Sequence, residues 1–138
     1  MSRRFIFILL LLTTSLANAT ESEQLVVQIN RQVYINGAYL KYNIYLTNPG
    51  NPNANVSNVV YFDIVDAQNN SYLKWKSRIK CHNLTGQIIL PETLNNGVYY
   101  LKAYTNVMRS YSLSQIGIAP FIVQRIYENP TDTLVFAK

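Results

Sequence analysis

Three features of the sequence predict an all-β fold. Apolar and polar residues alternate with period two in several segments, as strands with one buried face require. Turn-forming residues such as Asn-Gly and Pro separate these segments at regular intervals, and no segment between them has a convincing helical period. Counting the segments gives about seven strands, which favours an antiparallel β-sandwich of immunoglobulin-like type. A closed β-barrel is the alternative with the same strand pattern.

The N-terminus has the features of a secretory signal peptide over residues 1–19. Arg3 and Arg4 precede the apolar run FIFILLLL, and the small-residue pattern ANA ends at Ala19. The apolar run is shorter than the ~20 residues that a membrane-spanning helix needs. We therefore expect an exported protein, located in the periplasm, at the outer membrane or on the cell surface, with no transmembrane span in the mature chain.

Residues 20–127 have a suitable length for one sandwich domain, and residues 128–138 are expected to form a linker or tail. The chain carries 12 basic and 7 acidic side chains, a formal charge of +5. Removal of Arg3 and Arg4 with the signal peptide lowers that charge to about +3, too little to indicate a nucleic-acid partner. Cys81 is the single cysteine, so no internal disulfide can form.

The first half of the domain contains an expected strand at Leu25 to Asn30, LVVQIN, followed by QVYINGAYLKYNIYL. Asn36 and Gly37 are expected to form a hairpin-type turn within the second segment, because glycine accepts the positive φ of such turns. Beyond that turn, alternate residues share one apolar face: Leu40, Tyr42, Ile44 and Leu46. The segment NPGNPNANVS, rich in proline, glycine and asparagine, then forms a loop.

The second half begins with NVVYFDIVD, which is apolar on both faces and so predicts a central strand covered on both sides. SYLKWKSRIK then alternates, with Leu73, Trp75 and Ile79 inward. GQIIL is expected to end at Pro91, because proline cannot donate a hydrogen bond to a strand ladder. VYYLKAY follows an expected tight turn at Asn96-Gly97. PFIVQRIY is the last expected strand. The predicted core includes Phe62, Ile64, Leu73, Trp75 and Leu101.

The search for catalytic or metal-binding residues finds no enzyme constellation. Cys81 and His82 are adjacent, and adjacent residues on a strand point to opposite faces, so they are not expected to form a nucleophile–base pair. His82 is the only histidine, which leaves no Ser–His–Asp triad. Asp63 and Asp66 are too isolated for a calcium loop. We therefore predict a protein that is not an enzyme and needs no cofactor or metal.

The outward positions of SYLKWKSRIK form a basic stripe: Lys74, Lys76, Arg78 and Lys80. Such a stripe can protect a sheet edge or face against association with other strands. It can also contact an anionic glycan, lipopolysaccharide or an acidic protein partner. These cations, together with Arg109, are the candidate interaction surface.

The segment LPETLNNGVYYLKAYTNVMR resembles the macroglobulin-type domain, in which a pattern LP…L.sG.Y.L.AYTnwMR occurs near the end of the sandwich. VYINGAYLKYNIYL and SNVVYFDIVDAQNN resemble two earlier patterns of the same family, in the same order, so the resemblance extends from about Leu25 to Arg109. The motif positions to which it assigns structural roles are Gly37, Pro91, Gly97, Tyr104 and Asn106. Near the motif's end, Thr105 and Asn106 are expected to bond nearby backbone, and Arg109 to fold back on exposed carbonyls or a tyrosine face.

The resemblance implies an exported, non-enzymatic structural or interaction module of the cell envelope. Such modules occur in larger macroglobulin-like or TonB-receptor-associated surface proteins of Bacteroidota-type bacteria. An endopeptidase-inhibitor-like role is one alternative, although the family's thioester sequence GCGEQ is absent from this chain. A carbohydrate-binding sandwich is another, because the chain contains 11 tyrosines that could stack on sugars. The tail Glu128 to Lys138 is expected to be mobile or to add as a strand to a partner; the alternative is that its apolar LVF segment packs back on its own sandwich.

Overall fold

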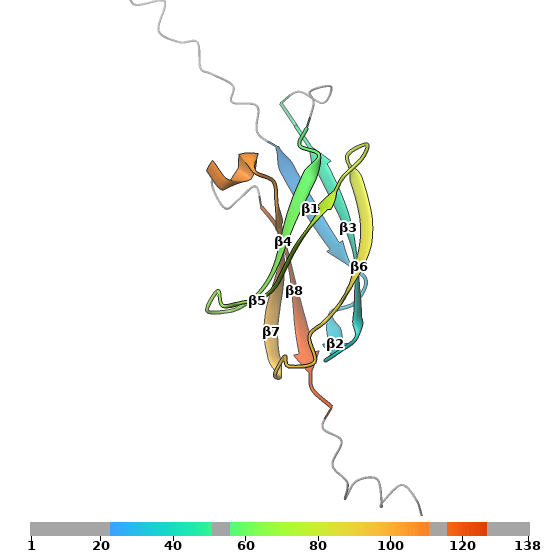
Figure 1. The fold of residues 1–138 in the computed structure, drawn as a ribbon, viewed down its shortest axis with the longest axis vertical. Coiled ribbons are helices and arrows are strands. Elements are labelled where there is room, and N and C mark those ends of the chain that lie inside the picture. The colour runs from blue at the N-terminus through green and yellow to red at the C-terminus, as the bar shows by residue number, and fades with distance from the viewer. Residues whose placement is uncertain (1–22, 51–55, 111–115, 127–138) are drawn as a thin grey trace, which may run out of the picture.

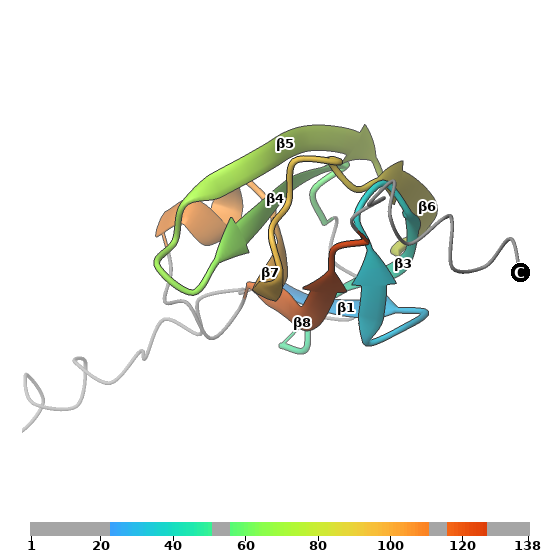
Figure 2. The same cartoon turned by 90° about the horizontal axis from the view of Figure 1, so that it is seen from below.

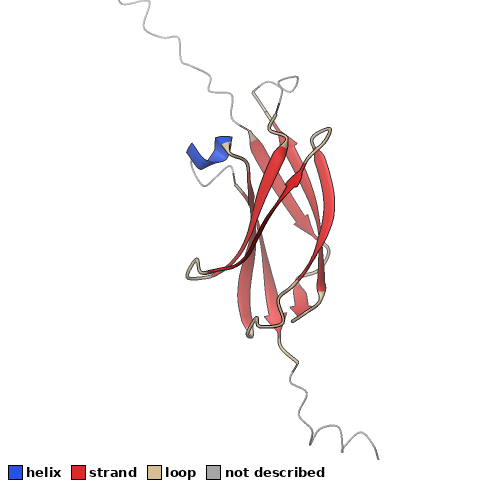
Figure 3. Ribbon diagram, viewed as in Figure 1, coloured by secondary structure: helices blue, strands red, loops and turns tan. Residues whose placement is uncertain are grey.

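A computed structural model describes residues 23–50, 56–110 and 116–126. The expected signal peptide (1–19) and tail (128–138) lie outside the described residues. The described chain is all β apart from one short turn of 3₁₀ helix, η3 (Val107–Ser110), as Figure 3 shows.

Within the described residues, eight strands form two packed sheets, which confirms the predicted β-sandwich (Figures 1 and 2). The smaller sheet is antiparallel and has the order β1 (Gln24–Ile29), β3 (Tyr39–Thr47), β6 (Asn83–Ile89). The larger sheet has the order β2 (Val33–Ile35), β8 (Gly117–Gln124), β7 (Gly97–Tyr104), β4 (Val59–Asp66), β5 (Ser71–Arg78). Seen from below in Figure 2, the larger sheet curves around the smaller one.

The two Asn-Gly turns do not close hairpins, contrary to the sequence-based expectation. At the first, Gly37 has φ +78° and Ala38 N–H donates to the Ile35 carbonyl at 3.1 Å, so the tight turn itself forms. However, β2 pairs in parallel with β8, while β3 belongs to the other sheet. Likewise β6 and β7, on either side of Asn96-Gly97, lie in different sheets. Both turns therefore carry the chain from one sheet to the other.

Pro120 lies inside β8 although proline lacks the N–H that a central strand donates. The pairing explains why it is tolerated. Among the described residues, β2 pairs with β8 only from Ile122 to Gln124, so at Pro120 the strand has one described neighbour, β7. The prediction that this strand begins at Pro120 is therefore wrong, and β8 starts three residues earlier at Gly117.

The core lies between the two sheets, and every strand except the edge strands β5 and β6 contributes buried residues to it. Phe62, Ile64 and Leu101 of the predicted core have exposed fractions of 1% or less. Leu73 and Trp75 pack against this core but are only partly buried, because their strand β5 is at the edge of its sheet. The Trp75 ring stacks on Phe62 with centroids 4.8 Å apart, and its Nε1 donates to the Tyr42 hydroxyl at 3.3 Å.

Cys81 and His82 occupy the tip of the turn between β5 and β6, not positions on a strand, contrary to the sequence-based expectation. Both have left-handed backbone, with φ of 54° and 65°. Lys80 and Asn83 form the bridge that closes this two-residue turn. Glycine and asparagine are the residues that usually supply positive φ at such positions.

We expect Cys81→Asn to stabilise the fold by about 0.5–1 kcal/mol, because asparagine tolerates the left-handed region better than other side chains. Urea titration of both proteins under reducing conditions measures the difference. Cys81→Val is the matched control, since a β-branched residue at positive φ should lower the free energy of unfolding. Equal stabilities for the Asn and Val variants would show that the turn's backbone is not strained.

Candidate functional site

The predicted cations lie on the outer face of the larger sheet, the face turned away from the core. Lys74, Lys76 and Arg78 occupy alternate, exposed positions of β5. Lys80 lies just beyond the strand, in the bridge that precedes the Cys81-His82 turn. The basic stripe therefore has three members on the strand and a fourth at its end.

Strand pairing places two tyrosines beside this stripe. Tyr61 of β4 is the cross-strand neighbour of Lys76 on one side and of Tyr104 on the other. The two tyrosine rings are stacked, with centroids 5.8 Å apart and planes 16° from parallel. β4 is central, as predicted, but this face is covered by side chains rather than by a second layer of strands.

η3 brings Arg109 over the tyrosine pair. Met108 is 1% exposed and anchors this helical turn in the core, so the next residue, Arg109, points outward. The carbon at the centre of its guanidinium lies 4.7 Å from the ring centroid of Tyr61 and 5.4 Å from that of Tyr104. These are cation–π distances. Of the two contacts that the sequence suggested for Arg109, the structure contains the one with tyrosine.

The side chains of Thr105 and Asn106 bond side chains distant in sequence. They were expected to bond the nearby backbone instead. Asn106 Nδ2 donates to the Tyr61 hydroxyl at 3.3 Å. Thr105 is fully buried, and its hydroxyl donates to the Glu23 carboxylate at 2.7 Å. The segment after β7 therefore fixes Tyr61 and the start of β1 as well as Arg109.

Together these residues line a shallow hollow of about 290 Å³, which we call the Arg109 hollow: Tyr61, Phe62, Lys74, Trp75, Lys76, Tyr104 and Arg109. Phe62 and Trp75 face the core, so the outward side chains of the hollow are three cations and two tyrosines. A guanidinium in cation–π contact with aromatic rings can still donate its N–H groups to a carboxylate or another oxyanion. The hollow thus has the chemistry of an anion-binding surface.

The two carboxylates nearest the basic stripe in sequence, those of Asp63 and Asp66, accept hydrogen bonds within the β4–β5 hairpin. Asp66 accepts hydrogen bonds from the backbone and side chain of Asn70 and from the Tyr72 hydroxyl. The Asn70 side chain is the main cause that lowers the pKa of Asp66. Asp63, the cross-strand neighbour of Lys74, accepts from the Ser71 hydroxyl. Within the described residues, no ion pair is formed by Lys74, Lys76 or Arg109.

The remaining motif residues lie away from the hollow. Gly37 contacts Glu92, since a Cβ there would approach the Glu92 Cγ to 3.3 Å. Pro91 follows the end of β6, and Gly97 is the first residue of β7. These three positions shape the crossings between sheets at the end opposite η3. They do not contribute to the Arg109 hollow.

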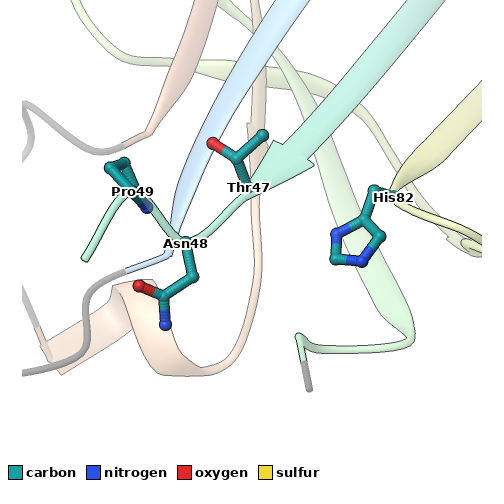
Figure 4. A pocket seen from close by; sticks show the side chains of 4 residues that line it. All are labelled: Thr47, Asn48, Pro49 and His82. Atoms are coloured by element: carbon teal, nitrogen blue, oxygen red, sulfur yellow. The ribbon is translucent and has the colours of Figure 1, made fainter. Parts of the chain in front are cut away.

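A second hollow of about 300 Å³ lies at the end of β3 and is lined by Thr47, Asn48, Pro49 and His82. Figure 4 shows these four side chains spread along the strand end rather than converging on one point. His82 Nδ1 is 3.0 Å from the Leu46 carbonyl oxygen, so this ring nitrogen is used by the turn. No group of three or more His, Cys, Asp or Glu side chains with metal-binding geometry occurs in residues 23–50, 56–110 and 116–126.

No protein-family model and no curated protein matches the sequence. Solved structures do match the fold. The native conformation of Escherichia coli alpha-2-macroglobulin aligns with a TM-score of 0.60 and 15% identity over 80% of this chain. The chain has a macroglobulin-like fold.

Two further macroglobulin structures give the same result. Elastase-activated Escherichia coli alpha-2-macroglobulin aligns with a TM-score of 0.58 and 17% identity over 74% of this chain, and a Salmonella alpha-2-macroglobulin mutant with 0.59 and 15% over 77%. The macroglobulin-like domain spans only 6–8% of the length of these neighbours. In addition, no helix of the described part is long and apolar enough to cross a membrane.

Tyr61 is the residue of the hollow that sequence reasoning missed. From the sequence, Tyr61 was expected to lie on a strand with protein layers on both faces. In the structure its ring lies on the outer face, where it contacts Tyr104 and Arg109. The available signal was the alternation itself, because Tyr61 falls on the opposite face from Val60 and Phe62.

Proposed function

We propose that this chain is an exported, non-enzymatic binding module of the bacterial cell envelope that contacts an anionic partner through the outer face of its larger sheet. The observation that carries the proposal is the Arg109 hollow. Three cations meet there beside two tyrosines, and none of the three forms an ion pair within the described residues, although Asp63 lies opposite Lys74. The N-terminal sequence pattern supports export, and the macroglobulin-like fold supports a module that forms part of a larger surface assembly.

A protein surface with several unpaired cations attracts anions at a distance, and this attraction weakens as salt is added. We therefore expect the mature chain to bind poly-L-glutamate in low salt, with an affinity that falls steeply as the salt concentration rises. The variant Lys76→Glu/Arg109→Glu should reduce the affinity by about tenfold or more, because two attractions become repulsions. Biolayer interferometry at several salt concentrations measures this.

The matched control is Arg31→Glu/Lys41→Glu, which changes the net charge by the same amount. Arg31 and Lys41 are exposed and lie on the β1–β3 side of the molecule. If the two variants weaken binding equally, net charge alone attracts the polyanion. In that case the Arg109 hollow is not a binding surface and the proposal is wrong.

An endopeptidase-inhibitor-like module is the second candidate, and the alpha-2-macroglobulin neighbours favour it. One of them is described as activated by porcine elastase. At 15–17% sequence identity, this structural similarity supports a shared fold but not a shared activity. A carbohydrate-binding role has less support, because the tyrosine pair of the hollow already stacks with Arg109.

A further inference from the structure

The free edge of β5 is the feature that extends the proposed function. β5 is the last strand in the order β2-β8-β7-β4-β5 and, in the part of the chain that the structure describes, pairs only with β4. The next strand along the chain, β6, belongs to the other sheet, and the described residues place no strand on the open side of β5. An edge strand presents a row of backbone N–H and C=O groups to which another strand can bond.

The charges on this edge determine which strand can bind. Lys74, Lys76 and Arg78 follow one another at every second residue, so their spacing along the strand is about 7 Å. An added strand has the same spacing between its own alternate side chains. Residues directly opposite each other on neighbouring strands are in contact, and opposite charges stabilise the pair whereas like charges destabilise it.

A second copy of β5 therefore fits this edge poorly, because its own cations would face Lys74, Lys76 and Arg78. The contrast with β6, an edge of the smaller sheet, is clear: its sequence NLTGQII has no charged residue. The charge pattern on β5 both disfavours self-pairing and favours a strand with carboxylates at alternate positions. Such a strand would lie beside the Arg109 hollow, which Lys74 and Lys76 also line.

We propose that β5 accepts an extended acidic segment of a partner polypeptide, with Asp or Glu at every second position, as a sixth strand of the larger sheet. Backbone hydrogen bonds along the edge hold the segment, and the three cations select its charge and register. This inference rests on the proposed function and specifies the chemical class of the partner.

The test uses the complete mature chain and peptides of eight residues, the length of β5. One peptide alternates threonine with glutamate, and a second has the same composition with the glutamates in one block. A third is the alternating peptide with every backbone nitrogen methylated, which cannot donate to the ladder from either edge. We expect the alternating peptide to bind about tenfold more tightly than either of the others, measured by fluorescence anisotropy.

Two further measurements locate the complex. Hydrogen exchange of the amides of Ser71 to Arg78 should slow when the alternating peptide binds, which charge attraction alone does not cause. The variant Lys74→Glu/Lys76→Glu/Arg78→Glu should lose this peptide and instead bind a peptide that alternates threonine with lysine. Arg31→Glu/Lys41→Glu, with both cations on the β1–β3 side of the molecule, should bind the acidic peptide nearly as well as the unchanged chain.

The outcomes separate this inference from the proposed function. If all three peptides bind equally and the β5 amides exchange as before, the anionic surface exists but strand addition is wrong. If an oligogalacturonate binds at the same cations and the alternating peptide does not, the partner is a glycan and the inference is overturned. If neither the peptides nor poly-L-glutamate bind, both proposals fail.

Discussion

Glu23→Ala should lower the free energy of unfolding by about 3 kcal/mol, since buried hydrogen bonds to a charged group contribute about 1.5–3 kcal/mol each. Glu23 is 5% exposed. Its carboxylate accepts from the Ser57 backbone N–H at 2.6 Å, and from the hydroxyls of Ser57 and Thr105 at 2.9 Å and 2.7 Å. The carboxylate therefore ties the start of β1 to the segments before β4 and after β7, which belong to the other sheet.

Urea titration of Glu23→Ala measures the effect, with Glu92→Ala as the control for loss of an exposed carboxylate. Thr105→Val removes one donor while keeping the volume, so the double variant should show a coupling of about 1 kcal/mol. A loss below about 1 kcal/mol for Glu23→Ala, or additive effects of the two changes, would contradict a shared buried network.

Trp75→Ala should lower the free energy of unfolding by about 3 kcal/mol, the lower end of the usual cost of removing a core tryptophan. The lower end applies because Trp75 is only partly buried on the edge strand β5. Its ring covers Phe62 and contacts Tyr42, with ring centroids 4.8 Å and 6.0 Å apart. Removal of the ring opens the core at that edge.

Two variants separate the contributions. Trp75→Phe keeps an aromatic ring on Phe62 but loses the Nε1 hydrogen bond to the Tyr42 hydroxyl, so it should cost about 1 kcal/mol. Lys76→Ala, on the opposite face of the same strand, should change stability by less than about 0.5 kcal/mol. If Trp75→Ala and Lys76→Ala had similar effects in denaturant titration, the inward and outward faces of β5 would be wrongly assigned.

The strands themselves were predictable from sequence because burial on one face imposes a period of two. In β3, the residues expected on one face are the buried ones: Leu40, Tyr42, Ile44 and Leu46. The tight turn at Asn36-Gly37 was also predictable, and Gly37 has the positive φ expected of it. The turn sequence did not predict which strands pair, because a turn at Gly37 is compatible with a hairpin and with a crossing between sheets. Long-range packing decides between them.

The candidate site divides in the same way. Lys74, Lys76 and Arg78 could be assigned to one outward face from their spacing alone. The contact of Tyr61 with Asn106 joins residues 45 positions apart, and that of Glu23 with Thr105 joins residues 82 positions apart. No short-range sequence pattern predicts such pairs. The Arg109 hollow and the buried Glu23 carboxylate could therefore be identified only in the folded structure.

The central claim is that an anionic partner binds at the outer face of the larger sheet, and amide chemical shifts test it most directly. ¹⁵N-labelled mature chain is titrated with poly-L-glutamate oligomers, and the shift of each amide is followed. The proposed function predicts that the largest shifts cluster at β5, at Tyr61 and Tyr104, and at η3. Shifts that are largest on β1, β3 and β6, or spread evenly over the surface, would contradict it.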